Sequence, residues 1–71
     1  MSGLDLRFTN LKGANLSRAN LSRAKASGAV LSEAILVDST LKGTSFSKSD
    51  LSRADLKRAD MRKAKLVQAD L

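Results

Sequence analysis

Large apolar residues recur at every fifth position through almost the whole chain. The series runs from Leu6 to Leu71 without insertion, and Ala26 is the one small residue at these central positions. A small residue, usually Ala, lies two positions before each centre, and Asp or Asn often lies directly before it, as in LSRADLKRAD (51–60). Because Asp and Asn side chains can accept hydrogen bonds from nearby backbone N–H groups, they favour a turn in each unit.

This five-residue period fits neither regular secondary structure. In an α-helix five residues advance by a net ~140°, so the centres would scatter around the helix and form no apolar stripe. In a flat strand the odd spacing would put successive centres, such as Leu16 and Leu21, on opposite faces. The period instead predicts a chain that turns a corner once per unit, so that each centre points towards one common axis.

The A(D/N)Lxx pattern resembles the pentapeptide repeat family, and the resemblance extends from Leu4 to Leu71. It implies an all-β fold, a right-handed quadrilateral parallel β-helix (solenoid) in which four units form one coil. The centre and the small residue would face the interior, and the other three residues would face outwards. Residues 1–71 are then expected to form a single pentapeptide-repeat β-helix domain of about three and a half coils.

Such a coil would stack equivalent residues of units that lie four apart along the chain. One internal column is then Leu6, Ala26, Phe46 and Leu66, in which the one small centre lies next to the one aromatic centre. We expect these two residues to compensate in volume, since cores tolerate exchanges that conserve total volume. Hydroxyl residues replace the inward-facing Ala at Ser39, Thr44 and Ser49. Their buried hydroxyl groups should find backbone carbonyl partners.

The composition argues against catalysis. The chain has no His and no Cys, which excludes a His general base, thiolate chemistry and the usual zinc ligands. No catalytic residue, cofactor or metal is therefore expected, and the protein is not predicted to be an enzyme. The N-terminal stretch MSGLDLRF lacks the pattern of a signal peptide, and the longest apolar run, Ala34 to Val37, is too short to cross a membrane. We therefore expect a cytoplasmic protein without membrane insertion.

The formal net charge of +6 raises the question of an anionic partner. Folded as a square, the chain would gather a candidate anion-binding face on one side, opposed there only by Asp60. This face consists of Arg23, Lys42, Arg62 and Lys63. A solvated surface that keeps a Leu-rich repeat soluble is the simpler interpretation of the same residues.

Two apolar features could instead contact a protein. Val30, Ile35 and Val37 occupy outward positions and form a candidate partner patch, although β-branched residues also simply favour extended backbone. At the C-terminal end the last coil should expose apolar centres and unpaired backbone groups, which favour pairing with another chain. The candidate end-docking residues are Leu56, Met61, Leu66 and Leu71.

These features predict a non-catalytic structural or protein-interaction scaffold module that docks on its own copy or on a larger assembly through its uncapped C-terminal end. The alternative is a basic module that binds nucleic acid or another anionic surface, with nucleic acid the less favoured partner. Some members of the family modulate topoisomerases by imitating DNA. That role is least favoured, because the charge here is positive and a prism of ~15–20 Å spans only about five base pairs.

The fold prediction can be checked by far-UV circular dichroism. Because the period excludes an amphipathic helix, the spectrum should be of β type with little helical signal, despite the abundance of Ala, Leu, Lys and Arg. A predominantly helical spectrum would contradict the square.

Overall fold

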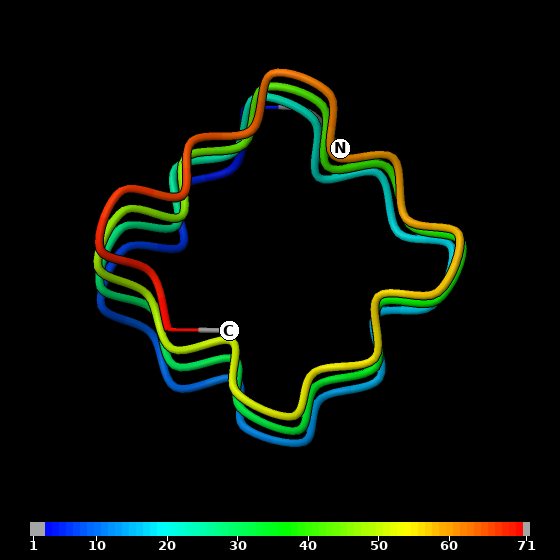
Figure 1. Ribbon diagram of the computed structural model, residues 1–71, viewed down its shortest axis with the longest axis horizontal. Helices are drawn as coiled ribbons and strands as arrows, with labels where there is room; N and C mark the ends of the chain where they lie inside the picture. The colour runs from blue at the N-terminus through cyan, green and yellow to red at the C-terminus, as the bar shows by residue number, and fades with distance from the viewer. Residues whose placement is uncertain (1–2, 71) are drawn as a thin grey trace.

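The computed structural model describes residues 3–70, which wind into a four-sided prism with one corner in each five-residue unit (Figure 1). The molecule measures 21 × 21 × 17 Å along its principal axes. In Figure 1 the chain runs counter-clockwise while successive levels, coloured from blue to red, rise towards the viewer. The solenoid is therefore right-handed, as the resemblance implied.

Successive levels are joined by parallel bridges between residues that lie four units apart. The series begins with Asp5↔Lys25 and ends with Asp50↔Asp70, and every bridge is isolated. Residues 3–70 accordingly contain no helix, and no strand that extends beyond a single bridging residue. The spacing is the one expected for four units per coil, but the sides are much less strand-like than the term β-helix suggests. The reason is that each chain segment turns again before a second residue can form a bridge.

Backbone hydrogen bonds repeat in the same way in each unit. The N–H groups of Leu31 and Glu33 donate to the carbonyls of Asp50 and Ser52 on the next level, at 2.7 and 2.9 Å. In the opposite direction, the N–H of Asp50 donates to the carbonyl of Ala29 at 2.9 Å. Each unit of the middle levels is thus tied by backbone groups to the levels above and below it, which satisfies the polar groups that a buried chain cannot leave unpaired.

A β-turn forms each corner. In one unit the N–H of Ala34 donates to the carbonyl of Leu31 at 3.0 Å, and Glu33 between them has a φ of 61°. A positive φ at the third turn residue is typical of type II turns, and Gly adopts it at the lowest cost. Gly fills this position in only four of the described units. In the others a non-glycine residue adopts the left-handed conformation: Phe8, Arg18, Arg23, Glu33, Asp38, Lys48, Arg53, Arg58, Lys63 and Gln68.

The Asp or Asn before the centre supports the turn, as the sequence predicts. Asn15 Oδ1 accepts hydrogen bonds from the backbone N–H and the hydroxyl of Ser17, at 3.1 and 2.7 Å. Asp50 Oδ1 accepts the same pair from Ser52, at 3.0 and 2.6 Å. These side chains therefore satisfy the backbone N–H of the residue that follows the centre, at the point where the turn begins.

The core lies along the axis of the prism and consists of the centres and the small residues of the middle levels. Leu36, Leu41 and Phe46 are fully buried, and Ala26 is buried to the same extent as Phe46. The backbone N–H of Ala26 donates to the carbonyl of Ser45 at 2.8 Å, which places Ala26 directly beneath Phe46 in one column. The predicted neighbours are therefore neighbours in the structure, and the small residue makes room for the aromatic ring.

The three inward hydroxyl residues are buried and hydrogen-bonded, as expected. The hydroxyl groups of Ser39 and Ser49 donate to the carbonyls of Leu36 and Phe46, both at 2.7 Å. Thr44 instead donates to the carbonyl of Leu21 one level below, at 2.6 Å. The described residues contain no buried side-chain nitrogen or oxygen without a partner. These hydroxyl groups are therefore accounted for by the fold and need no ligand.

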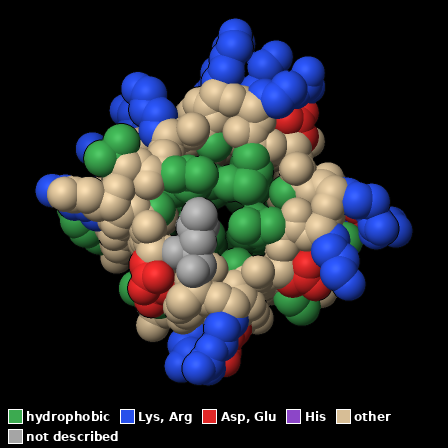
Figure 2. All heavy atoms as spheres, in the orientation of Figure 1, with side chains coloured by type: hydrophobic (Ala, Val, Ile, Leu, Met, Phe, Trp, Pro, Cys, Tyr) green, Lys and Arg blue, Asp and Glu red, His purple; other side chains and the backbone are tan. Residues whose placement is uncertain are grey.

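Burial decreases towards both ends of the prism. The centres Leu6, Leu11 and Leu16 on the first level and Leu56, Met61 and Leu66 on the last are only partly buried. Figure 2 views the end that carries residues 50–70 and shows a hydrophobic area in its middle, with Lys and Arg side chains and some acidic side chains around the rim. Leu71, the fourth predicted end-docking residue, lies outside the described residues.

The Ala26 and Phe46 column can be tested by a double-mutant cycle. Ala26→Leu should lower the free energy of unfolding by about 1–3 kcal/mol, because the added methylene groups meet the Phe46 ring. Adding Phe46→Leu should recover part of that loss. Urea denaturation of the single and double variants measures both effects, and strictly additive losses would show that the two side chains do not share a column.

Candidate interaction surfaces

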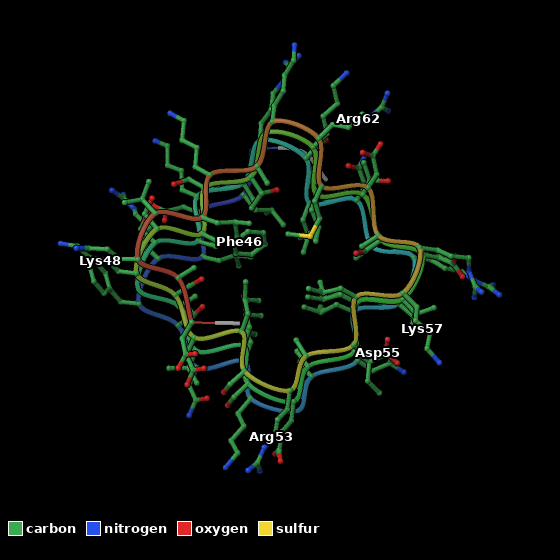
Figure 3. All side chains as sticks on the ribbon, in the orientation of Figure 1. Phe46, Lys48, Arg53, Asp55, Lys57 and Arg62 are labelled. Carbon is green, nitrogen blue, oxygen red and sulfur yellow. The ribbon has the colours of Figure 1, made fainter. Side chains whose placement is uncertain are left out.

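The repeat of four units per coil assigns each unit to one of four sides. The labelled residues Lys48, Arg53, Lys57 and Arg62 mark the four corners in Figure 3, one for each side. Consecutive sides along the chain are neighbours on the prism. Side A holds residues 5–9, 25–29, 45–49 and 65–69; side B holds 10–14, 30–34, 50–54 and 70; side C holds 15–19, 35–39 and 55–59; side D holds 20–24, 40–44 and 60–64.

The structure brings the four residues of the candidate anion-binding face together on side D. Lys42 and Arg62 belong to one column and Arg23 and Lys63 to the next, because the members of each pair are separated by whole coils. The Arg23 side chain packs over Gly43, since its Cγ lies 3.6 Å from where a Cβ of that glycine would stand. Gly43 therefore leaves room for the Arg23 side chain.

Arg62 is already engaged within its own unit. Its Nε and Nη2 donate to the two carboxylate oxygens of Asp60, at 2.9 and 2.7 Å. Hydrogen bonds from the Arg62 side chain, and then from its backbone N–H, lower the pKa of Asp60 from 3.8 to about 2, against an opposing effect of desolvation. Among residues 3–70, the cations of this face that form no ion pair are Arg23, Lys42 and Lys63.

Sides B and C carry a different arrangement of charge. Arg58 donates to both carboxylate oxygens of Asp38 one level below, at 2.6 and 3.2 Å, and lowers the pKa of that carboxyl group. Arg53 lies 3.7 Å from Glu33 in the corresponding pair on side B. In these two pairs, opposite charges on adjacent levels cancel locally, whereas the like charges Asp50 and Asp70 stack on side B.

The net charge is confined to two adjacent sides. Sides A and D together carry eight cationic and two anionic side chains, a formal charge of +6. Sides B and C together carry five of each sign and are neutral. The prism thus has a basic half, defined as sides A and D, and a neutral half, defined as sides B and C.

The predicted apolar patch spans two sides of the neutral half. Val30 on side B is 36% exposed and Ile35 on side C is 39% exposed, whereas Val37 on side C is half-buried. All three point away from the core. Since a corner separates Val30 from the other two, they do not form one flat contact surface.

Two more exposed apolar side chains were not singled out from the sequence. Phe8 is 82% exposed and Val67 is 66% exposed, and both lie at the corners of side A. Phe8 covers Gly28 on the next level, where an added Cβ would come within 2.7 Å of the ring. Both residues could have been identified from the sequence, because large apolar residues are otherwise rare at the two turn positions that follow a centre.

The polar surface of side B is hollowed at one place. Side B has a depression of about 290 Å³ whose walls carry both signs of charge. It is lined by Lys12, Ser32, Glu33, Asp50, Ser52 and Arg53. Within residues 3–70, no group of three or more potential metal-ligating side chains comes together. The described part of the chain also contains no helix with the length and hydropathy needed to span a membrane.

The comparisons with known proteins agree with the fold. A family profile described as Pentapeptide repeats matches the chain in eight copies, over residues 1–36 and 34–71. The chain therefore belongs to the pentapeptide repeat family, whose members are generally structural repeat proteins without catalytic activity. A comparison with curated proteins found no match.

Two solved structures resemble the chain over 94% of its length. A pentapeptide repeat protein from Nostoc Pcc 7120 is 34% identical with a TM-score of 0.93, and the chain covers 55% of it. A pentapeptide repeat protein from the Arabidopsis thaliana thylakoid lumen is 27% identical with a TM-score of 0.91, and the chain covers 46% of it. The chain thus spans about half the length of either protein, and both confirm the right-handed β-helix.

The Asp60–Arg62 pair gives a pH prediction. In an NMR titration the Asp60 carboxyl group should titrate near pH 2, and Arg62→Gln should move this pKa back towards 3.8. Because the folded-state pKa is lowered, any stability from the pair is present above pH 3.8 and is lost as the pH falls towards 2. Both side chains are partly exposed, so the change in stability should be small. An unchanged Asp60 titration in Arg62→Gln would show that the pair does not form in solution.

Proposed function

We propose that this protein is a non-catalytic interaction scaffold that docks through its C-terminal end, on a second copy of itself or on a larger assembly. The observation that carries the proposal is the difference in burial between two levels of the same columns. Leu56, Met61 and Leu66 are only partly buried, although their counterparts one level below are at most 1% exposed. Those counterparts are Leu36, Leu41 and Phe46. A covering chain would give the outer centres the same environment.

The backbone at this end supports the same proposal. The N–H groups of Leu36 and Leu41 donate to carbonyls of the last level, each at 2.7 Å. The corresponding N–H groups of Leu56 and Met61 have no backbone partner among residues 3–70. Such a row of open donors is a template for an added chain, and the apolar centres beside it supply the contact area. A docked chain would therefore gain hydrogen bonds and apolar burial together.

A second copy meets an electrostatic cost that a different partner can avoid. Lys and Arg side chains outnumber acidic side chains at the rim around the apolar end (Figure 2). Two such rims brought together repel each other, and salt screens that repulsion over about 10 Å at ~0.1 M ionic strength. Association between copies should therefore strengthen with salt, whereas an acidic partner would bind more weakly as salt is added.

The proposed scaffold is a domain of about three and a half coils that acts in the cytoplasm and uses no cofactor. A DNA-mimicking role stays the least favoured, because the basic half carries the opposite sign to DNA. The basic half supports instead the alternative of binding to an anionic surface. The chain covers only about half of each related structure, so no activity is carried over from those proteins, and the function stated for this chain is a proposal.

End docking can be tested by sedimentation velocity at low and high salt. Wild-type protein should self-associate more strongly at high salt, and Leu66→Lys should weaken association by about tenfold or more, because it buries an unpaired charge. Val67→Lys is the matched control, since it adds the same charge at a neighbouring position whose side chain is exposed on side A.

Equal effects of Leu66→Lys and Val67→Lys would contradict docking through the end. A monomer at high micromolar concentration that neither substitution changes would exclude the second copy as the occupant. Capture of a partner by wild-type protein, lost in Leu66→Lys and retained in Val67→Lys, would then be required for the proposal to stand.

A further inference from the structure

Most cations of the basic half form no ion pair among the described residues. Arg7 and Arg62 form two-point contacts with Asp5 and Asp60, with a shortest distance of 2.7 Å in each pair. These pairs use both carboxylates of the basic half. The remaining cations, none of which forms an ion pair among residues 3–70, are Arg23, Lys25, Lys42, Lys48, Lys63 and Lys65.

The chemistry of these remaining cations favours one kind of anionic partner. Five of the six are Lys. Lys is a compact point charge without the planar fork that makes Arg suited to two-point recognition of a phosphate or a base. Clusters of Lys at a protein surface are attracted instead to the diffuse negative potential of anionic lipid headgroups. The composition of this surface therefore favours an extended anionic surface, such as a layer of lipid headgroups, over a single phosphate group in a fixed geometry.

The most exposed large apolar side chains of the described residues lie on the same half. Phe8 and Val67 are 82% and 66% exposed at the corners of side A, compared with at most 39% for the large apolar residues of the neutral half. The N–H of Lys48 donates to the carbonyl of Val67 at 3.0 Å, so a cation and an apolar side chain occupy adjacent levels of one corner. Figure 3 shows that Lys48 projects outwards from this corner.

The backbone conformation of Phe8 carries an energetic cost. Its φ of 61° lies in the left-handed region, which a bulky residue adopts only at an energetic cost. Its ring rests on Gly28 at the surface, so the core gains nothing from it. An exposed aromatic ring on the same side of the prism as Lys side chains is the combination that peripheral proteins place at the boundary between headgroups and acyl chains.

We propose that sides A and D form a docking surface for an anionic lipid bilayer. The Lys side chains would lie among the headgroups, while Phe8 and Val67 reach the upper edge of the acyl region. The contact is peripheral and leaves the prism intact, with the corner of side A lying along the membrane. This surface is distinct from the end face that carries the proposed protein docking, so either proposal can fail without the other.

Nucleic acid is the less suitable occupant of the same surface. Phosphate backbones are bound by cations, and Phe8 and Val67 would have no role there, except that one ring could stack on one base. A bilayer uses both the cations and the apolar side chains. Substitution of Phe8 and Val67 should therefore weaken binding to a bilayer more than binding to nucleic acid.

The test is co-sedimentation of the full chain with vesicles of phosphatidylcholine alone or mixed with phosphatidylserine, at low and physiological ionic strength. Binding should require phosphatidylserine and should weaken as salt is added. Lys25→Asp combined with Lys65→Asp should weaken binding by about tenfold or more, because two cations near the surface are replaced by anions. Phe8→Asn combined with Val67→Ser should weaken it several-fold at both ionic strengths.

The chain offers a matched control for the charge change. Lys12→Asp combined with Lys57→Asp alters the net charge by the same amount on the neutral half, and should change vesicle binding by less than about twofold. The Lys25 and Lys65 substitutions suit the fold, because Asp already occupies this position of the unit and Asp50 already stacks on Asp70. Unchanged circular dichroism of all variants shows that the prism is retained.

Three outcomes would overturn the proposal. They are the absence of vesicle binding at low ionic strength, equal losses in the two charge variants, and vesicle binding that Phe8→Asn with Val67→Ser leaves unchanged. Retention on duplex DNA without binding to vesicles would assign the basic half to nucleic acid instead.

Discussion

The hydrogen-bond register between levels is the constraint on which the rest of the structure depends. Each bridge joins residues that lie four units apart, as Asp5 and Lys25 do, so each unit must use five residues and make one corner. One residue more or fewer would move every later residue by one column and bring a turn residue into the core. This explains why the series from Leu6 to Leu71 contains no insertion. It also explains why ten non-glycine residues accept a positive φ, at a cost on the order of 1 kcal/mol each, since the corner cannot be omitted.

The same register divides the chain into inward and outward positions, which differ in how many residue types they can accept. An inward position must match the volume of its column, as Ala26 does beneath Phe46, or must donate to a carbonyl, as Ser39 does to Leu36. An outward position has only to allow the turn. Side chains that lie four units apart in sequence become neighbours on one side, so the charges of the chain separate into a basic half and a neutral half. Information about partners is therefore carried by the outward columns.

The interior could be predicted from the sequence because it follows directly from the period. The column of Phe46, the partners of the buried hydroxyl groups and the gathering of Arg23 and Lys63 on one side need only the spacing of four units per coil. The surface depends on side-chain conformations that the period does not determine. The pairing of Arg62 with Asp60 removed one cation from the predicted face. The exposure of Phe8, in contrast, follows from its corner position and could have been predicted from the period. The isolated bridges were also unforeseen, because the extent of pairing on each side depends on how soon the next turn begins.

The two proposed surfaces are geometrically independent, and this affects how they can act together. The end face is perpendicular to the axis and consists of apolar centres and open backbone donors, whereas the basic half runs parallel to the axis. A chain docked on the end would leave sides A and D free, and a bilayer against those sides would leave the end free. The cations at the rim link the two surfaces, because they repel a second copy and attract an anionic lipid. Neutralising them with headgroups would lower the repulsion between copies as added salt does, so a charged membrane favours end-to-end contact without touching the end face.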